Sequence, residues 1–169
     1  GNSGDNVSPN LFSLSNKNPL HTSRDGKAEV MNSSNVLVGT ATTNITYDEF
    51  SGNFKGLVDF GSQIPSTGPY TVKFTSSTHL RRLVPGIQNI VVGQTNIVEA
   101  ITLVAGDVNS DNVLNILDYN LLIGCYSDFA PALSCTTSNK LLTDLNDDGK
   151  VNQFDYNLFL RELTVQNGQ

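Results

Sequence analysis

Two clusters of acidic and amide side chains in the last third of the chain have the residue types and spacing to bind a metal ion. The segment 107–123, DVNSDNVLNILDYNLLI, aligns without gaps with the segment 144–160, DLNDDGKVNQFDYNLFL. Eight of the seventeen positions are identical, and Asp or Asn occupies positions 1, 3, 5, 9 and 12 of both copies. An internal repeat of this kind predicts two copies of one structural unit.

The spacing matches an EF-hand-type calcium loop, in which side chains and one backbone carbonyl surround a hard cation with oxygen atoms. We expect the first loop to bind calcium through the side chains of Asp107, Asn109, Asp111, Asn115 and Asp118 and the carbonyl of Val113. The second loop would use the side chains of Asp144, Asn146, Asp148, Asn152 and Asp155 and the carbonyl of Lys150. The sequence therefore predicts two bound Ca²⁺ ions.

Positions 6 and 12 of the loops refine this prediction. Position 6 needs a backbone with positive φ, which suits Gly149 in the second loop and is tolerated by Asn112 in the first. Position 12 is Asp in both copies, and this shorter carboxylate favours a structural calcium site over a regulatory switch. Three carboxylates in each loop would repel one another without a cation, which is a second reason to expect calcium.

The repeat resembles the type I dockerin family over about residues 105–163. The resemblance implies a small three-helix module with two calcium ions, and it implies a cohesin domain as the partner. Loop positions 10 and 11, which contact cohesin and are often small hydroxyl residues in the family, are Ile116-Leu117 and Gln153-Phe154 here. The basic pair that often follows on the helix is replaced by Ile123-Gly124 and Leu160-Arg161.

Helical spacing follows each loop. Leu117, Leu121 and Cys125 are expected on one face of the first helix, and Phe154, Leu158 and Arg161 near the matching positions of the later one. Cys125 and Cys135 are ten residues apart, and we expect a disulfide between them, which would indicate an oxidising compartment. The alternative is two reduced thiols, with Cys125 buried in a helix.

The preceding residues have the pattern of short strands. Tyr70, Val72 and Phe74 alternate with polar residues, as in a half-buried strand. Further strands are expected at 34–39, 43–49, 53–60, 79–84, 87–92 and 97–104, with a hairpin turn at the sequence GQTN. The pattern predicts a mostly antiparallel β-sandwich of the immunoglobulin-like or transthyretin-like kind. The predicted organisation is an extended N-terminal arm (1–27), the sandwich (28–104), the calcium module (105–163) and a tail (164–169).

Composition narrows the function. The net charge of −6 without a basic stripe argues against nucleic-acid binding, and no apolar run is long enough to insert in a membrane. The chain begins at Gly1, so we expect a mature, processed protein found outside the cell or at its surface. Neither His21, in the arm, nor His79, in a strand, belongs to a catalytic motif, and we expect no enzyme activity.

Three functions remain open at this point. The first prediction is a calcium-stabilised, non-enzymatic subunit of an extracellular filament, in which residues near 5–20 of one copy add a strand to the sandwich of the next copy. The alternative is a dockerin-type module that anchors a larger secreted protein or enzyme to a cohesin-like receptor. A third reading is a fragment of an enzyme whose catalytic domain lies outside this sequence. The expected partner is therefore another copy of the chain or a cohesin-like domain.

Overall fold

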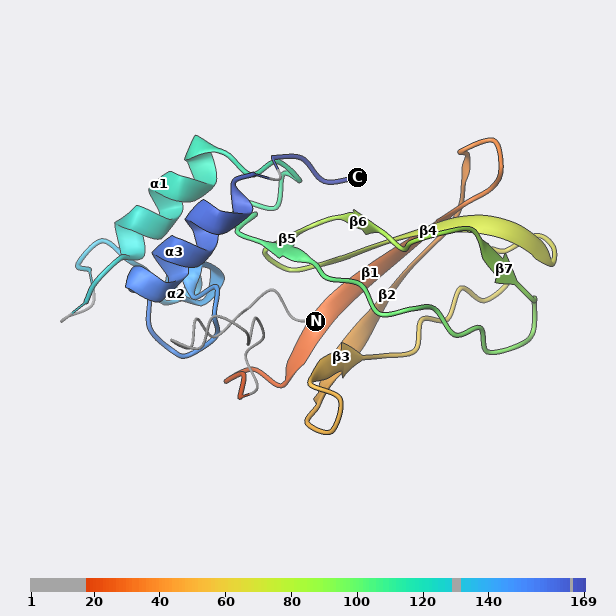
Figure 1. Cartoon of the computed structure of the whole chain (residues 1–169), viewed down its shortest axis with the longest axis horizontal. Coiled ribbons are helices and arrows are strands. Elements are labelled where there is room, and N and C mark those ends of the chain that lie inside the picture. The colour runs from red at the N-terminus through yellow and green to blue at the C-terminus, as the bar shows by residue number, and fades with distance from the viewer. Residues whose placement is uncertain (1–17, 129–131, 165) are drawn as a thin grey trace.

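The computed structural model describes residues 18–128, 132–164 and 166–169, and it places a β domain beside a small helical module (Figure 1). The β domain begins with β1 (Ser23–Met31), β2 (Leu37–Asp48), β3 (Asn53–Lys55) and β4 (Gly68–Ser76). Four short strands follow, β5 (His79–Leu80), β6 (Arg82–Leu83), β7 (Gln88–Ile90) and β8 (Val104–Ala105). The helices are α1 (Ile116–Cys125), α2 (Thr137–Thr143) and α3 (Gln153–Glu162).

One antiparallel sheet forms most of the β domain. Its strand order is β3-β2-β1-β4-β6, and β7 also pairs with β4. Strand β1 is central, with Val30 opposite Gly39 of β2 on one side and opposite Val72 of β4 on the other. Its small and apolar residues Gly26, Ala28 and Val30 are buried at every second position, as one buried face of a pleated strand requires.

The predicted fold class, an antiparallel β domain followed by a three-helix module, is confirmed. The β domain takes the form of a curled sheet (Figure 1). A separate two-stranded sheet pairs β5 with β8, with Leu80 opposite Val104. This small sheet is the point at which the chain passes from the β domain to the helices.

Several strand boundaries differ from those predicted. The predicted strands 34–39 and 43–49 overlap the one continuous strand β2, and only the last residue of the segment 97–104 lies in a strand, β8. The amide N–H of Gln94 closes a turn on the carbonyl of Val91 at 3.2 Å, but no hairpin follows it within the described residues. Residues 23–27, assigned to the arm, begin strand β1, whereas residues 1–17 lie outside the described residues.

The helices α1 and α3 repeat the same local structure. Asn115 and Asn152 are their N-caps, and each makes a capping box with the Asp three residues later. The inward face of α1 consists of Asp118, Leu122 and Cys125. The predicted face was therefore wrong for Leu117, which is 55% exposed, and Phe154 of α3 is likewise exposed. The buried face of α1 begins with Asp118, the carboxylate at position 12 of the loop, and this residue sets which side of the helix faces inward.

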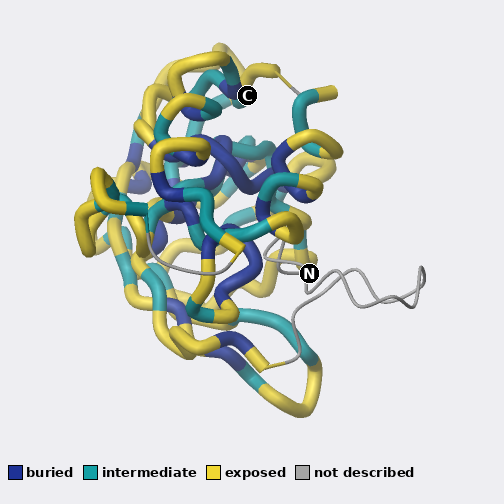
Figure 2. The backbone as a smooth tube through the Cα atoms, turned by 90° about the vertical axis from the view of Figure 1, so that its left-hand side faces the viewer, coloured by how far each residue is buried: buried dark blue, intermediate teal, exposed yellow. Residues whose placement is uncertain are grey.

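The described residues form two apolar cores. The core of the β domain is formed by Val30, Ile64, Tyr70, Val72 and Val84. The core of the helical module contains Leu122, Leu158 and Phe159, and it also contains Leu80 and Val104 from the small sheet β5–β8. Figure 2 shows buried positions running through both parts of the chain. The described residues contain no helix with the length and apolarity needed to cross a bilayer.

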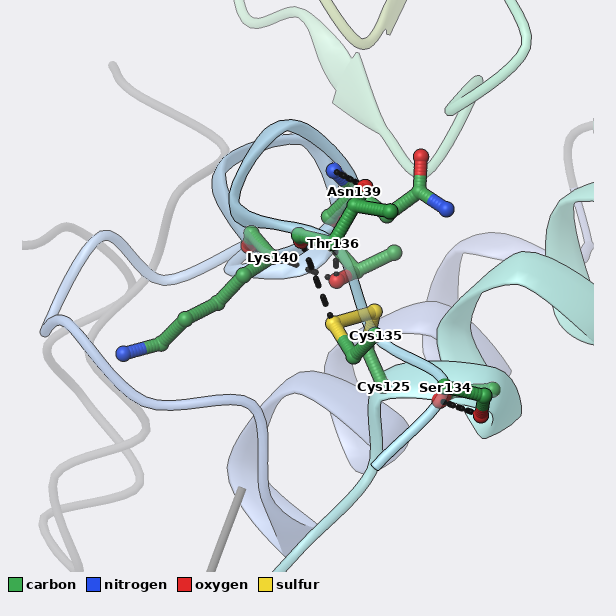
Figure 3. Close-up of a disulfide and its surroundings, with 8 residues drawn as sticks. Cys125, Ser134, Cys135, Thr136, Asn139 and Lys140 are labelled. Carbon is green, nitrogen blue, oxygen red and sulfur yellow. Dashed lines mark hydrogen bonds between the residues drawn. A yellow bond between two sulfur atoms is a disulfide. The ribbon is translucent and has the colours of Figure 1, made fainter. Parts of the chain in front are cut away.

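The predicted disulfide between Cys125 and Cys135 is confirmed, with the two Cα atoms 4.8 Å apart. It joins the last residue of α1 to the residue before the N-cap of α2, Thr136 (Figure 3). The hydroxyl of Thr136 accepts a hydrogen bond from the amide N–H of Asn139 at 3.1 Å, which caps the short helix. The covalent bond therefore fixes how α2 follows α1.

Candidate metal centre

The first loop is held in shape by hydrogen bonds from backbone amides to its own acidic side chains. Asp107 accepts from the N–H groups of Asp111 (3.0 Å) and Asn112 (2.9 Å). Asp118 accepts from the N–H groups of Asn109 (3.1 Å) and Asn115 (3.0 Å), one at each carboxylate oxygen. These bonds pull positions 1 and 12 of the loop toward the same centre.

The second loop repeats this network bond for bond. Asp144 accepts from the N–H groups of Asp148 (3.0 Å) and Gly149 (2.7 Å). Asp155 accepts from the N–H groups of Asn146 (3.1 Å) and Asn152 (2.9 Å). The two loop sequences differ at about half of their positions. The network is nevertheless the same, because the accepting acids at positions 1 and 12 are identical in both copies and the donors are backbone N–H groups.

The amide side chains and the position 7 residues also occupy matching places. Asn109 and Asn146 each donate a side-chain N–H to the acid at position 5, Asp111 and Asp148, at 2.9 and 3.1 Å. The backbone N–H groups of Val113 and Lys150 donate to the same two carboxylates, at 2.8 and 2.9 Å. The structure thus gathers all twelve predicted residues into two equivalent loops.

The acidic oxygens of the first loop converge on one point. One carboxylate oxygen from each of Asp107, Asp111 and Asp118 lies within 4.8 Å of the others. Carboxylate, amide and carbonyl oxygens are the ligands that Ca²⁺ prefers, and a 12-residue loop of this kind suits its coordination number. The donor set therefore fits a calcium ion, and the assignment of each residue as a ligand stays a prediction.

Burial of the acids shows why a cation would stabilise these loops. Desolvation raises the pKa of Asp107 and of Asp144 to about 6 and that of Asp155 to about 7, and neighbouring loop carboxylates add to the rise. The backbone hydrogen bonds described above act in the opposite direction, but burial dominates. A divalent cation favours the ionised form of each acid and offsets this cost.

Two further loop residues carry contacts that the repeat pattern did not reveal. Asp147, at position 4 of the second loop, is 4% exposed and accepts hydrogen bonds from His21 and Arg24 of the β domain. Asn112, at position 6 of the first loop, accepts one from the backbone of Arg81. Neither contact could be found from the loop sequence, because both partners lie far away along the chain. The loop sequences give one hint that these residues have separate roles, because positions 4 and 6 differ between the two copies.

Comparison with known protein families matches residues 105–164 to the dockerin type I domain. No curated protein matches the chain. Two similar solved structures are an N-terminal and a C-terminal interface mutant of a type II cohesin–X–dockerin complex from Acetivibrio cellulolyticus, 17% and 18% identical. Each alignment covers 82% of this chain and 80% of the other chain with a TM-score of 0.46, and we draw no conclusion from a similarity at that level.

The family match confirms the resemblance seen in the repeat, so residues 105–164 form a type I dockerin domain preceded by a β domain. Dockerin domains bind calcium, in agreement with the predicted loops. The match contradicts the first predicted function, a filament subunit, because a dockerin accounts for the repeat as an attachment module. The strand donation that the filament required involves residues near 5–20, and of these residues 5–17 lie outside the described residues.

Proposed function

We propose that the type I dockerin domain at residues 105–164 attaches this protein to a cohesin domain, and that two calcium ions hold it in the binding conformation. The proposed role is non-enzymatic: the chain serves as an anchor, and calcium binding by the loops fixes the surface that contacts the cohesin domain. It fits a protein that works outside the cell, where disulfides persist and calcium is abundant. The bond between Cys125 and Cys135 is consistent with such a compartment.

The observation that carries this proposal is that apolar side chains are exposed at the start of each of the two repeated helices. Ile116 and Leu117 of α1 are 63% and 55% exposed, and Phe154 of α3 is 36% exposed. Exposed apolar side chains that lie next to one another can mark a protein–protein contact. These are the loop positions 10 and 11 at which the family resemblance places cohesin contacts.

A cleft lies between the start of α1 and the last turns of α3. It has a volume of about 450 Å³, and Ile116 and Tyr119 of α1 line it together with Phe159 and Leu160 of α3. Ile123 and Leu160, which replace basic residues expected from the family, are also exposed, at 41% and 42%. We infer that the matching cohesin surface is apolar, with few of the acidic residues that a basic pair would need.

Binding of the full chain to a panel of cohesin domains, measured by calorimetry with calcium and with EDTA, tests the proposal. We expect nanomolar to micromolar binding to at least one member with calcium and none with EDTA. The substitutions Leu117→Asp and Phe154→Asp should each weaken binding by roughly 10-fold or more, because each places a charge in a desolvated contact.

Leu133→Asp is the matched control. Leu133 is fully exposed and lies outside α1 and α3, so its substitution should leave the dissociation constant unchanged. Equal losses for Leu133→Asp and Leu117→Asp would show that the helical surface is not the contact. A panel without any calcium-dependent binder would reject the proposed function itself.

A further inference from the structure

We propose that the β domain stabilises both calcium sites. Its hydrogen bonds hold, or brace, the turn of each loop, so that calcium binding and the packing of the two domains stabilise each other. The inference rests on the calcium binding proposed above. It assigns positioning roles to Asn112 and Asp147, two residues that the predicted ligand sets do not include. Both have positive φ, of 65° and 57°, and so lie where each loop reverses direction.

The first loop is braced through Asn112. Its side-chain oxygen accepts a hydrogen bond from the backbone N–H of Arg81, between β5 and β6, at 2.8 Å. Its backbone carbonyl accepts another from the N–H of Gly168 at 3.0 Å. The sharp turn of this loop is therefore bonded on one side to the β domain and on the other to the C-terminal residues.

The C-terminal residues 166–169 complete this brace. Leu114, which follows the turn, donates its N–H to the carbonyl of Gln166 at 2.8 Å, and the N–H of Gln169 donates to the carbonyl of Arg81 at 2.8 Å. Figure 1 shows the end of the chain leaving α3 on the side of the helices that faces the β domain. This segment was predicted as a tail, and it instead links the first loop to the β domain.

The second loop is braced through Asp147. Its carboxylate accepts from the backbone N–H of His21 at 3.0 Å and from the Nη2 of Arg24 at 2.9 Å, and it lies 2.5 Å from the Nδ1 of His21. Its backbone carbonyl accepts from the N–H of Leu20 at 3.0 Å. Four contacts thus converge from the residues around the start of β1 on one buried residue of the loop.

The geometry makes the coupling reciprocal. The contacts of Asn112 and Asp147 are made with the loops in their folded conformation, in which the carboxylate oxygens of the first loop converge. Calcium stabilises that conformation from inside the loop, and the β domain stabilises it from outside. By linkage, each must then strengthen the other by the same factor. The shared core residue Leu80, from β5, adds a second route for the coupling.

The substitution Asn112→Gly separates this inference from a purely local account. Glycine stands at the same position of the second loop, as Gly149 with a φ of 87°, so local backbone preference predicts unchanged or tighter calcium binding. The brace predicts the opposite: loss of the hydrogen bond to Arg81 should weaken calcium binding by the first loop by about 3- to 10-fold. The substitution is neutral, so the Coulomb energy of the site does not change.

Calcium titrations of the full chain, followed by NMR, provide the measurement. The amide signals of Asp111 and Asp148 report the two loops separately, because each N–H donates to the first acid of its own loop. Gly168→Ala is a second variant that changes no loop residue. A Cβ atom there would lie 1.8 Å from the Oδ1 of Asn112, so it should also weaken the first loop and not the second.

Gly149→Asn is the matched control, because it places Asn at position 6 of the loop that Asp147 braces. It should weaken the second loop slightly or leave its affinity unchanged, and tighter binding there would overturn the inference. Equal or tighter calcium binding by the first loop in Asn112→Gly would also overturn it while leaving the calcium sites intact. If the unmodified chain bound no calcium, the proposed function would fail first and the inference with it.

Discussion

Arg24 at the start of the β domain forms an ion pair with Asp147 in the second calcium loop, with 2.9 Å between Nη2 and Oδ2. Both side chains are largely buried, at 16% and 5% exposed. The guanidinium also lies 4.9 Å from the ring centroid of Phe54, in a cation–π contact. One arginine therefore ties β1, β3 and the dockerin domain together.

Removing either partner of this pair should destabilise the protein. Arg24→Met and Asp147→Asn should each lower the free energy of unfolding by about 2–4 kcal/mol, because each leaves the other partner without its buried counter-charge. The double variant should lose clearly less than the sum of the two. Urea unfolding with saturating calcium measures all four proteins, and strictly additive losses would contradict a direct interaction.

Calcium removal should unfold the dockerin domain. Without a cation, three carboxylates in each loop face one another, and burial already raises the pKa values of Asp107, Asp144 and Asp155. Circular dichroism should show loss of most helical signal in EDTA and its return with calcium. Asp107→Ala and Asp144→Ala should each reduce the number of bound ions from two to one by calorimetry. An unchanged thermal melt in EDTA would refute this expectation.

Substitution of Leu80 should weaken the helical module although the residue belongs to β5. Leu80 is fully buried among residues of the helical core. Leu80→Ala should therefore cost about 2–5 kcal/mol of unfolding free energy and raise amide exchange in α1 and α3. Val84→Ala, in the core of the β domain, serves as the comparison and should raise exchange mainly in β1 and β4. Similar exchange patterns for the two variants would show that the cores are not distinct.

His79 should make the calcium-saturated protein sensitive to acid. Burial of the ring, assisted by the charge of Arg24, lowers its pKa to about 4. A lowered folded-state pKa means that stability is complete above the unfolded value near 6.5 and declines as the pH falls toward 4. Between pH 7.5 and pH 5, protonation of His79 alone should lower the free energy of unfolding by about 2 kcal/mol.

The variant His79→Asn isolates that contribution. Its amide can replace the contact between Nδ1 of His79 and the carbonyl of Ser77, 2.6 Å long, without adding a titratable group. The difference in unfolding free energy between pH 7.5 and pH 5 should be smaller by about 2 kcal/mol than in the unmodified protein. An equal pH dependence in the two proteins would remove His79 as the cause.

Opening the disulfide should loosen the connection between α1 and α2 more than the calcium loops. The bond closes a short loop between Cys125 and Cys135, and its loss should cost about 2–3 kcal/mol. Exchange at residues 125–135 should rise in Cys125→Ser/Cys135→Ser, while the amides of Asp111 and Asp148 stay protected by calcium. Greater exchange in the loops than in this segment would contradict the expected division of roles.

The parts of the protein that could be predicted from the sequence are those formed by residues close together along the chain. The twelve loop residues, the positive φ at Asn112 and the bond between Cys125 and Cys135 all depend on contacts within about a dozen residues. Such contacts follow from spacing, because the chain has little freedom to place residues so close in any other way. Helices α1 and α3 followed for the same reason, since the Asn at position 9 of each loop is the N-cap of its helix.

The tertiary structure alone decided what joins these parts. Strand β1 escaped prediction because its buried face consists of Gly26, Ala28 and Val30, two of which are too small to mark a period of two. The sequence also could not predict that Leu80 packs in the core of the helical module, since an apolar residue in a short strand suits either core. The pairing of Arg24 with Asp147 spans 123 residues, and no local preference selects one buried acid among so many. Contacts of that kind depend on how the sheet and the helices pack, because packing alone brings such distant residues within hydrogen-bonding distance.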